Sequence, residues 1–366
     1  MTATLSTRTL NRTLLHRQHL TQRTGASALE VLKHLVAVQG QEPNWPYVGL
    51  WTRITDFKKD ELTELLETNA VVRSTVIRVT QHLVAAEDIG WLRPTVQPKV
   101  VRHLKAAHYA NEIEGIDHDE LAAAGREILS GGRMPRKEFI EKLSQRFPGH
   151  HPGRLADSVE VLHALVPAPS AAVWGSWRAR LKREVSLAEH VTGRPMEPAN
   201  VERMIRRYLA AFGPASVMDM QAWSGLTKLR DEVERLRPQL TVYRGEDGRE
   251  LFDLPGAPIV DGSEPVPVRF LPAYDNALLA YKDRTRIMSE SDRKRVTPGG
   301  ALVLPTFLVD GFVAGLWSVE GSTLTISPFR ELSAADEAAL AAEAAELYDF
   351  IAPDAPERDI RWEPAG

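Results

Sequence analysis

The sequence contains no cysteine, so disulfides, cysteine-ligated zinc or iron–sulfur sites and cysteine nucleophiles are all excluded. No apolar run approaches the roughly 20 residues that a transmembrane helix requires. The first residues, Met1–Leu5, lack the basic and then apolar layout of a signal peptide. We therefore expect a soluble protein of the cytoplasm, without a membrane partner.

Several standard catalytic signatures are also missing from the sequence. It contains no Walker loop, no glycine-rich dinucleotide fingerprint after a strand, no HExxH and no GxSxG. The 11 histidines form no group with convincing metal spacing. We expect neither a metal nor a cofactor.

The composition is that of an ordinary globular protein. Of the 366 residues, 43% are hydrophobic and 26% are charged, which excludes a collagen, a coiled-coil rod or a disordered chain. The length suits two to four modules. The net charge of −4 does not indicate nucleic-acid binding, but residues 133–183 hold ten Lys or Arg against four Asp or Glu. This local charge of +6 fits either a polyanion-binding surface or a solvated surface.

Residues 200–255 have the clearest local pattern. Apolar residues recur at helical spacing over 201–209, Phe212-Gly213-Pro214 ends that helix, and Ser216 can cap a second one that reaches Trp223. A third helix is expected over 227–236. Two alternating segments, 240–244 and 249–252, then flank a Gly-Glu-Asp-Gly turn. Three helices followed by a hairpin predict a winged helix-turn-helix.

The same order recurs twice in looser form. Residues 119–130, 135–147 and 153–164 read as helices, with the apolar segment around Ala171–Trp174 as the wing. Residues 8–18, 26–38 and 59–68 are also helical in pattern, and 71–84 reads as paired strands. The remainder predicts strands over 266–270, 301–308, 313–319 and 323–326 and a final helix over 334–350, packed through Leu340 and Leu347.

The predicted fold class is therefore mainly α with β-hairpin wings, an α+β arrangement of tandem winged helix-turn-helix units and a smaller C-terminal β-rich domain. The expected domains are 1–115, 116–195 and 196–255 as three winged-helix units, and 256–366 as a C-terminal α/β domain. Such units usually lay a helix in the major groove of DNA. A non-enzymatic transcriptional regulator and a protein-interaction scaffold are the alternatives that this pattern leaves open.

Two glutamines stand close together where an apolar helix is expected to end. Gln39 and Gln41 follow the apolar segment 35–38, and Tyr47-Val48-Gly49-Leu50-Trp51 comes soon after. Taken alone, the two amides are most simply partners for frayed carbonyl groups at the helix end.

The motif nevertheless belongs to an ordered set. The other members are Arg78-x-Thr80-x-His82-Leu83-Val84, Phe212-Gly213-Pro214-Ala215, Gln221-Ala222-Trp223-Ser224-Gly225-Leu226, Tyr274-Asp275-Asn276, Asp283-Arg284-Thr285-Arg286 and residues 305–315, which read PTFLVDGFVAG. In this order, over residues 35–315, the set resembles the AlkZ/YcaQ-like winged-helix DNA glycosylases. The resemblance covers nearly the whole chain.

The resemblance implies a C-shaped monomer that closes around double-stranded DNA carrying an alkylated purine. It assigns catalysis to Gln39 and Gln41. The implied reaction is hydrolysis of the N-glycosidic bond of an N-alkylated purine, including bulky N7-guanine adducts and interstrand crosslinks. We also expect a monofunctional glycosylase, without a lysine Schiff base. The expected DNA- or lesion-binding residues are Arg78, Thr80, His82, Trp45, Arg133, Arg136, Lys137, Arg178 and Arg180.

Two neutral amides suit this substrate class. Alkylation at N7 gives guanine a positive charge, so the base is already a good leaving group and needs little acid catalysis. An amide can orient a water molecule below C1′ and accept hydrogen bonds, which is mainly positioning. Glu42 is the nearest carboxylate and a conceivable base, although beside Pro43 it is expected to face solvent.

A strand over Thr75–Val84 would place Arg78, Thr80 and His82 on one face, where they either bind phosphate or lesion or are simply solvated. We expect structural roles for Asp275, Asn276 and Arg284. The family usually has Arg-Gly-Thr-Leu-His-Leu-Val over the segment that begins at Arg78, whereas this chain has Val79 and Gln81 in place of the Gly and the Leu. Gly40 stands where a larger residue is frequent. These departures suggest a pocket adapted to a particular bulky lesion, as in self-resistance to a DNA-alkylating natural product.

Overall fold

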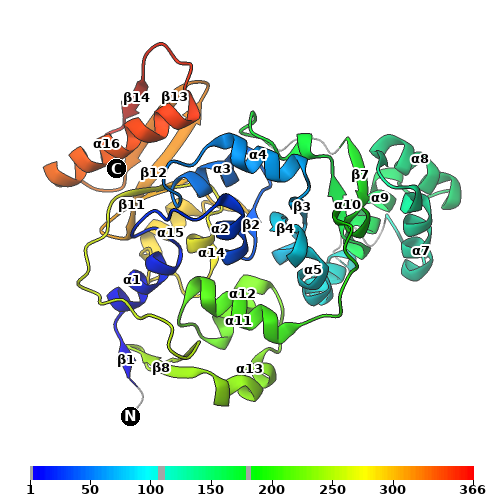
Figure 1. Cartoon of the computed structure of the whole chain (residues 1–366), viewed down its shortest axis with the longest axis horizontal. Coiled ribbons are helices and arrows are strands. Elements are labelled where there is room, and N and C mark those ends of the chain that lie inside the picture. Colours follow the sequence, from blue (N-terminus) through cyan, green and yellow to red (C-terminus); the bar gives the residue numbers. More distant parts are fainter. Residues whose placement is uncertain (1–2, 106–111, 179–182) are drawn as a thin grey trace.

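The computed structural model describes residues 3–105, 112–178 and 183–366. Helices surround four small sheets, so the fold is a mixed α/β arrangement (Figure 1). None of the described helices is long and apolar enough to cross a membrane. Arg180, one of the predicted DNA-binding residues, lies outside the described residues.

The N-terminal part places a small sheet among several helices. The helices are α1 (Thr7–Arg17), α2 (Ala28–His34), α3 (Asn44–Trp51), α4 (Lys59–Glu67) and α5 (Ala86–Val101, followed by the 3-10 turn η2 over Arg102–Lys105). The sheet has the order β2-β4-β3, with bounds Val38–Gln39, Gln81–Ala85 and Val71–Thr75. The predicted hairpin over 71–84 is thus confirmed, as are the helices over 8–18 and 59–68.

The predicted helix over 26–38 is wrong in its second half. A capping box of Ser27 and Glu30 begins α2, but the helix ends at His34 and Val36 has a left-handed backbone (φ 68°). The β-branched Val38 then enters β2. A short apolar run fits a helix or a strand equally well, and pairing with β4 decides in favour of the strand.

The predicted continuous strand over Thr75–Val84 is also wrong, because a tight turn interrupts it. Ile77–Val79 forms the 3-10 turn η1, and Arg78 and Val79 both have positive φ angles of 53° and 65°. The amide of Thr80 donates to the carbonyl of Ile77 at 3.1 Å, which closes the turn. Turns with two successive left-handed residues favour Gly at the second position. The family's usual Gly therefore fits this backbone, whereas Val79 is strained.

This strain gives a prediction for stability. We expect Val79→Gly to be more stable than Val79→Ala by about 1 kcal/mol, because only Gly adopts this backbone without a steric penalty. Both variants lack the valine methyl groups, so the difference between them reports the backbone strain and not lost packing. Urea unfolding of the two variants measures this difference in free energy. As a control at an exposed helical position, Ala123→Gly should instead lower the free energy of unfolding by about 1 kcal/mol. Equal stability of the two Val79 variants would contradict a strained turn.

The middle part of the chain has a hydrophobic core of its own. Its helices are α7 (His118–Ile128), η3 (Leu129–Gly131), α8 (Arg136–Arg146), α9 (Pro152–Leu162) and α10 (Ala188–Thr192), and its sheet has the order β5-β7-β6 (Met134–Pro135, Glu184–Leu187, Leu165–Pro167). The core residues, among them Phe139, Leu155 and Leu187, are all drawn from 121–187. The segment around Ala171–Trp174 was predicted to be the wing, and this prediction is wrong. The segment is not a strand, because η4 (Pro169–Ala171) and a loop follow β6.

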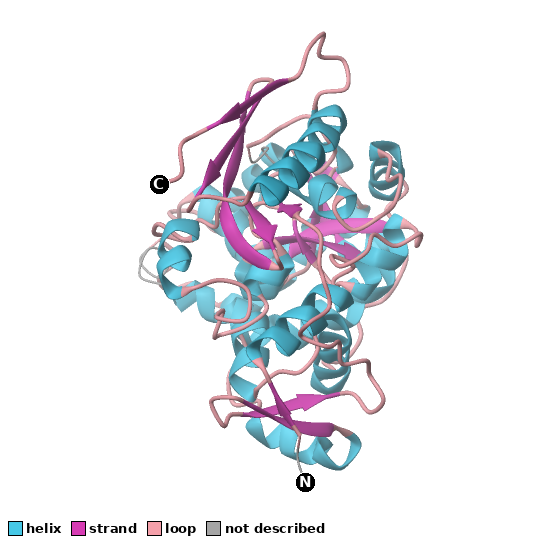
Figure 2. Cartoon of the chain, turned by 90° about the vertical axis from the view of Figure 1, so that its left-hand side faces the viewer, coloured by secondary structure: helices cyan, strands magenta, loops and turns pink. Residues whose placement is uncertain are grey.

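Three helices and a hairpin follow, in the predicted order. They are α11 (Val201–Phe212), α12 (Val217–Ser224), α13 (Arg230–Leu236), η5 (Arg237–Gln239), β8 (Thr241–Gly245) and β9 (Glu250–Asp253). The Ser216 side chain caps α12 by accepting from the amide of Asp219. The N-terminal strand β1 (Thr4–Leu5) adds to β8, and Figure 2 shows this sheet at the end of the molecule where the N-terminus lies.

A five-stranded sheet dominates the C-terminal part. Its order is β10-β11-β12-β13-β14, with bounds Arg269–Leu271, Thr306–Val309, Phe312–Glu320, Thr323–Pro328 and Asp359–Trp362, and the nearby helices are α14 (Asn276–Leu279), α15 (Glu290–Val296) and α16 (Ala334–Ile351). The strands expected over 313–319 and 323–326 and the final helix are confirmed, whereas β10 and β11 begin only at Arg269 and Thr306, later than the predicted 266 and 301. Leu340 and Leu347 of α16 are fully buried, as predicted. The parallel edge strand β14 was not predicted.

Candidate active site

Gln39 ends strand β2, and Figure 1 shows β2 near the centre of the molecule. It pairs with His82 of β4, and the amide of Gly40 donates to the carbonyl of Gln81 at 2.8 Å. The Gln39 residue is only 7% exposed. A Cβ atom at Gly40 would lie 3.3 Å from the Leu83 side chain, so the small residue lets the chain run close to β4. Gln39 is therefore held by a sheet, and does not end a helix.

Gln41 is exposed, but its main chain is anchored. Its carbonyl accepts a hydrogen bond from the buried guanidinium of Arg73 at 3.0 Å. Arg73 also donates to the carbonyl of Ala171 at 2.6 Å. The backbone position of Gln41 is thus fixed by two distant segments, while its amide remains available to solvent.

A small pocket adjoins Gln39. Trp45 of α3 and Tyr274 line it from opposite parts of the chain, together with Asn276. Its volume of about 10 Å³ is on the scale of a single water site. The Asn276 amide donates to the carbonyl of Ala37 at 2.9 Å, which holds the segment that leads into β2. The pocket therefore offers space for about one water molecule beside Gln39.

A buried ion pair between Arg53 and Asp275 forms part of the wall of this pocket. Both guanidinium nitrogens of Arg53 donate to Asp275, at 2.8 and 2.9 Å, and both side chains are almost fully buried. Arg53 also donates to the carbonyl of Gly49 in α3, and Asp275 accepts from the amide of Ala277 at the start of α14. The geometry gives Asp275 and Asn276 the structural roles expected from the sequence. Arg284 is half-buried in the loop before α15.

The loop of residues 172–178 packs against Asn44 and Trp45, which follow the two glutamines. The Asn44 side-chain oxygen accepts from the amides of Gly175 and Ser176 at 2.8 and 3.0 Å. The ring of Trp45 lies 4.8 Å from that of Trp177. These contacts join residues more than 100 positions apart, and sequence reasoning missed them because no local pattern signals such a contact.

The three polar residues expected on one strand face have separate surroundings. Arg78 is half-buried in the turn and donates to the carbonyl of Trp223 at 2.9 Å. The Thr80 hydroxyl donates to the carbonyl of Ile77. His82 is buried, and its Nδ1 lies 2.8 Å from the carbonyl of Thr80, so Nδ1 carries the proton and Nε2 is an acceptor. Burial first, and the nearby Arg78 charge second, lower the pKa of His82 to about 3.

The lowered pKa of His82 predicts acid sensitivity. An unfolded histidine has a pKa near 6.5, so between pH 6.5 and 3 the unfolded state takes up a proton that buried His82 refuses. The free energy of unfolding should therefore fall by up to about 1.4 kcal/mol per pH unit on acidification through this range. His82→Asn should flatten this slope in urea titrations between pH 7 and 5. The exposed His190→Asn is the matched control, and an unchanged slope in His82→Asn would contradict the assignment.

Gln81, which departs from the family pattern, also has a structural explanation. Its amide nitrogen donates to Glu160 at 2.7 Å, and the Thr75 hydroxyl donates to the same carboxylate oxygen at 2.7 Å. Gln81 is 6% exposed. Gln81 therefore links the hairpin to α9 by a hydrogen bond, where the family's usual Leu would make only apolar contacts.

The predicted basic residues do not form one surface around the glutamines. Arg133 and Lys137 are exposed, and Arg136 pairs with Asp157 at 2.5 Å. They lie at and near the start of α8, toward the edge of the molecule in Figure 1, whereas β2 is central. Arg178 is exposed directly after Trp177, in the loop that packs against Asn44 and Trp45. It is therefore close in sequence to residues that contact the segment after the two glutamines.

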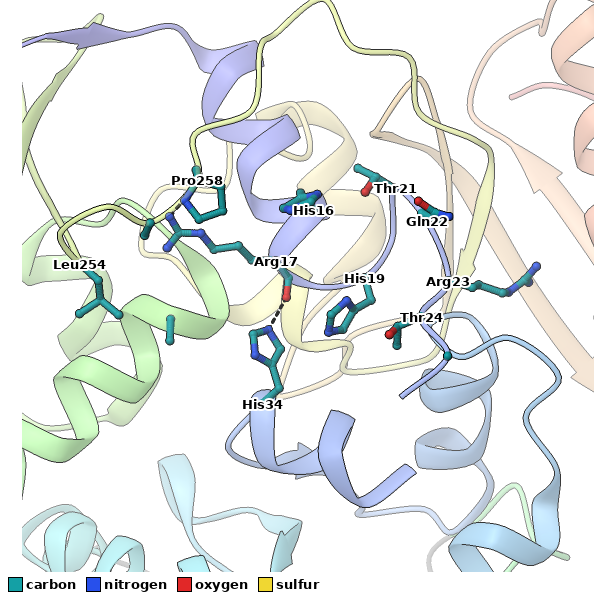
Figure 3. Close-up of a pocket in the computed structure, with 13 residues that line it drawn as sticks. His16, Arg17, His19, Thr21, Gln22, Arg23, Thr24, His34, Leu254 and Pro258 are labelled. Carbon is teal, nitrogen blue, oxygen red and sulfur yellow. Dashed lines mark hydrogen bonds between the residues drawn. The ribbon is translucent and has the colours of Figure 1, made fainter. Parts of the chain in front are cut away.

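A much larger pocket lies elsewhere. It encloses about 640 Å³ between the end of α1, the following loop and α2, and its lining includes His16, His19 and His34 (Figure 3). Burial is the main cause that lowers the pKa of His19 to about 4, so its ring is neutral at pH 7. Neither glutamine lines this pocket. Among the described residues, no group of three or more His, Asp or Glu side chains is arranged to hold a metal.

The order of motifs, the glutamine segment and the fold together match a family of DNA-repair enzymes. The family model described as "DNA glycosylase AlkZ-like" matches residues 32–350, and this chain belongs to that family. A relative from Streptomyces sahachiroi, named interstrand DNA cross-link repair glycosylase, is 24% identical over 374 aligned positions, which cover 91% of this chain and 93% of the relative. The solved structure of Streptomyces sahachiroi DNA glycosylase AlkZ has the same fold. It superposes with a TM-score of 0.79 at 21% identity, covering 98% of this chain and 100% of that one.

Proposed function

We propose that this protein is a monofunctional DNA glycosylase that hydrolyses the N-glycosidic bond of N-alkylated purines, with bulky N7-alkylguanine adducts and interstrand crosslinks as its preferred substrates. The observation that carries the proposal is the position of Gln39, which borders a pocket on the scale of one water site in a chain of this family. The name of the Streptomyces relative supports a crosslinked substrate.

The proposed chemistry depends on the substrate's own positive charge. Water attacks C1′, the bond from C1′ to N9 breaks, and its electron pair neutralises the N7-alkylated base as it leaves. The amide of Gln39 orients the water, and the exposed amide of Gln41 can accept a hydrogen bond from the water or the sugar. Because amides are poor bases, ordinary uncharged nucleotides should not react.

The lining of the pocket fits a monofunctional enzyme. A glycosylase that also cleaves the strand needs an amine nucleophile for a Schiff base. The described residues that line the Gln39 pocket include Arg53 but no lysine. The expected product is therefore an abasic site in an intact strand.

DNA binding by winged helices is the structural part of the proposal. The order α11-α12-α13-β8-β9 is that of a winged helix-turn-helix, and Ala215 bridges to Phe252 of β9 as a third short strand would. The separate core within 121–187 supports a second unit in the predicted range 116–195, beside 1–115, 196–255 and the domain 256–366. We expect a cytoplasmic monomer to bind one duplex, with exposed Arg133, Lys137 and Arg178 among its phosphate contacts.

A single-turnover assay tests the proposed reaction. Duplex DNA with one N7-methylguanine, and a second duplex with a guanine–guanine crosslink through N7, are incubated with excess protein. We expect abasic sites to form faster than by spontaneous depurination, crosslinked strands to separate, and strand breaks to appear only after alkali. Tight binding to undamaged DNA with background depurination on both substrates would indicate the non-enzymatic regulator instead.

A further inference from the structure

Glu42 follows the two glutamines directly, and it is less exposed to solvent than the sequence suggested. The residue is half-buried, and the indole N–H of Trp45 donates to its Oε2 at 2.7 Å. Trp45 is itself held between other rings, with Trp177 at 4.8 Å and Trp317 at 5.5 Å. The carboxylate is therefore held in place by a side chain that also lines the Gln39 pocket.

The carboxylate of Glu42 has no cationic partner among the residues that the structure describes. Several other half-buried or buried acids of this protein are paired with a cation, such as Asp157 with Arg136 and Asp275 with Arg53. The field of Glu42 nevertheless reaches the pocket, because its charge adds to burial in raising the pKa of Tyr274, which lines the pocket. A half-buried carboxylate with no cationic partner among the described residues is a natural partner for a positive charge on a ligand.

We propose that Glu42 supplies the negative charge that stabilises the cationic sugar as the glycosidic bond breaks. This inference rests on the proposed glycosylase function and adds to it a group that the two neutral amides do not provide. As C1′ loses its bond to N9, positive charge moves from the purine onto the deoxyribose. The attacking water then gives its oxygen to C1′ and its proton to solvent, so Glu42 acts through its charge and Trp45 is a positioning residue.

Binding of charged and uncharged product mimics tests this role without relying on turnover. The probes are duplexes that carry either a cationic pyrrolidine or a neutral tetrahydrofuran in place of one nucleotide. We expect the wild-type protein to prefer the cationic mimic by at least about tenfold, and Glu42→Gln to lose this preference. The amide oxygen of Gln can still accept from the Trp45 indole. Binding of undamaged DNA should not weaken, because a negative charge is removed beside a polyanion.

Two further variants keep the test decisive. Glu64→Gln removes an exposed glutamate of α4 and should keep the wild-type preference. Trp45→Phe keeps an aromatic ring but removes the N–H donor, and should reduce the preference by releasing the carboxylate. If the wild-type protein excises N7-methylguanine while Glu42→Gln and Trp45→Phe keep the full cationic preference, the inference about Glu42 is wrong and the glycosylase stands. If the wild-type protein neither excises the base nor prefers the cation, the proposed function itself fails.

Discussion

Replacement of both Gln39 and Gln41 by alanine is expected to lower the single-turnover rate of N7-methylguanine excision by about 10³-fold or more. Without the two amides, the water beside Gln39 loses its orientation, and well-oriented intramolecular groups are worth several kcal/mol of activation free energy. Gln39→Ala alone should have the larger single effect, because Gln39 borders the pocket whereas Gln41 is exposed.

The effect should be on the reaction rather than on DNA binding. Gln39 and Gln41 are neutral, so the double variant should bind undamaged duplex with nearly unchanged affinity and salt dependence. Gln145→Ala, an exposed glutamine of α8, is the matched control and should retain the wild-type rate. If the double variant kept more than a tenth of the wild-type excision rate, the proposed catalytic role of the two glutamines would be wrong.

Asp275→Asn is expected to give the largest loss of stability, about 3–5 kcal/mol in the free energy of unfolding. The substitution leaves the Arg53 guanidinium buried at 1% exposure without its carboxylate. Because Arg53 and Asp275 line the Gln39 pocket, the folded fraction of this variant should also excise N7-methylguanine more slowly.

Urea unfolding of matched variants measures this loss. Asp349→Asn removes one partner of the exposed pair between Asp349 and Arg358, whose side chains are both more than half exposed. It should change the free energy of unfolding by less than about 1 kcal/mol. If Asp275→Asn were no more destabilising than this control, the buried pair would not be a support of the site.

Local patterns in the sequence were sufficient to predict helices and strands that bury one face and expose the other. The helices and hairpin of 201–253 were predicted because a strong 3.6-residue period, a serine cap and a Gly-rich turn all agree there. The segment 35–38 was misread because an apolar run of this length has no decisive period. The turn at Arg78 and Val79 was missed because this chain lacks the Gly that usually marks such a backbone. Strand β14 pairs in parallel with β13, a contact that no local pattern in the sequence signals.

The site was predictable in its motif and not in its surroundings. Gln39 and Gln41 stand two residues apart in the sequence, so the family resemblance was enough to select them. The contacts of Asn44 and Trp45 with residues 175–177, and the pairing of Arg53 with Asp275, join segments that no local pattern connects. For the same reason the half-buried position of Glu42 became visible only in the folded chain.

Direct detection of the released base is the measurement that tests the central claim most sharply. Wild-type protein in excess is mixed with duplex DNA that carries one N7-methylguanine, and free base is quantified by mass spectrometry against the same duplex without protein and with the Gln39→Ala/Gln41→Ala variant. The account predicts release well above spontaneous depurination by the wild type alone. Equal release in all three samples, under conditions where the protein binds the duplex, would contradict it.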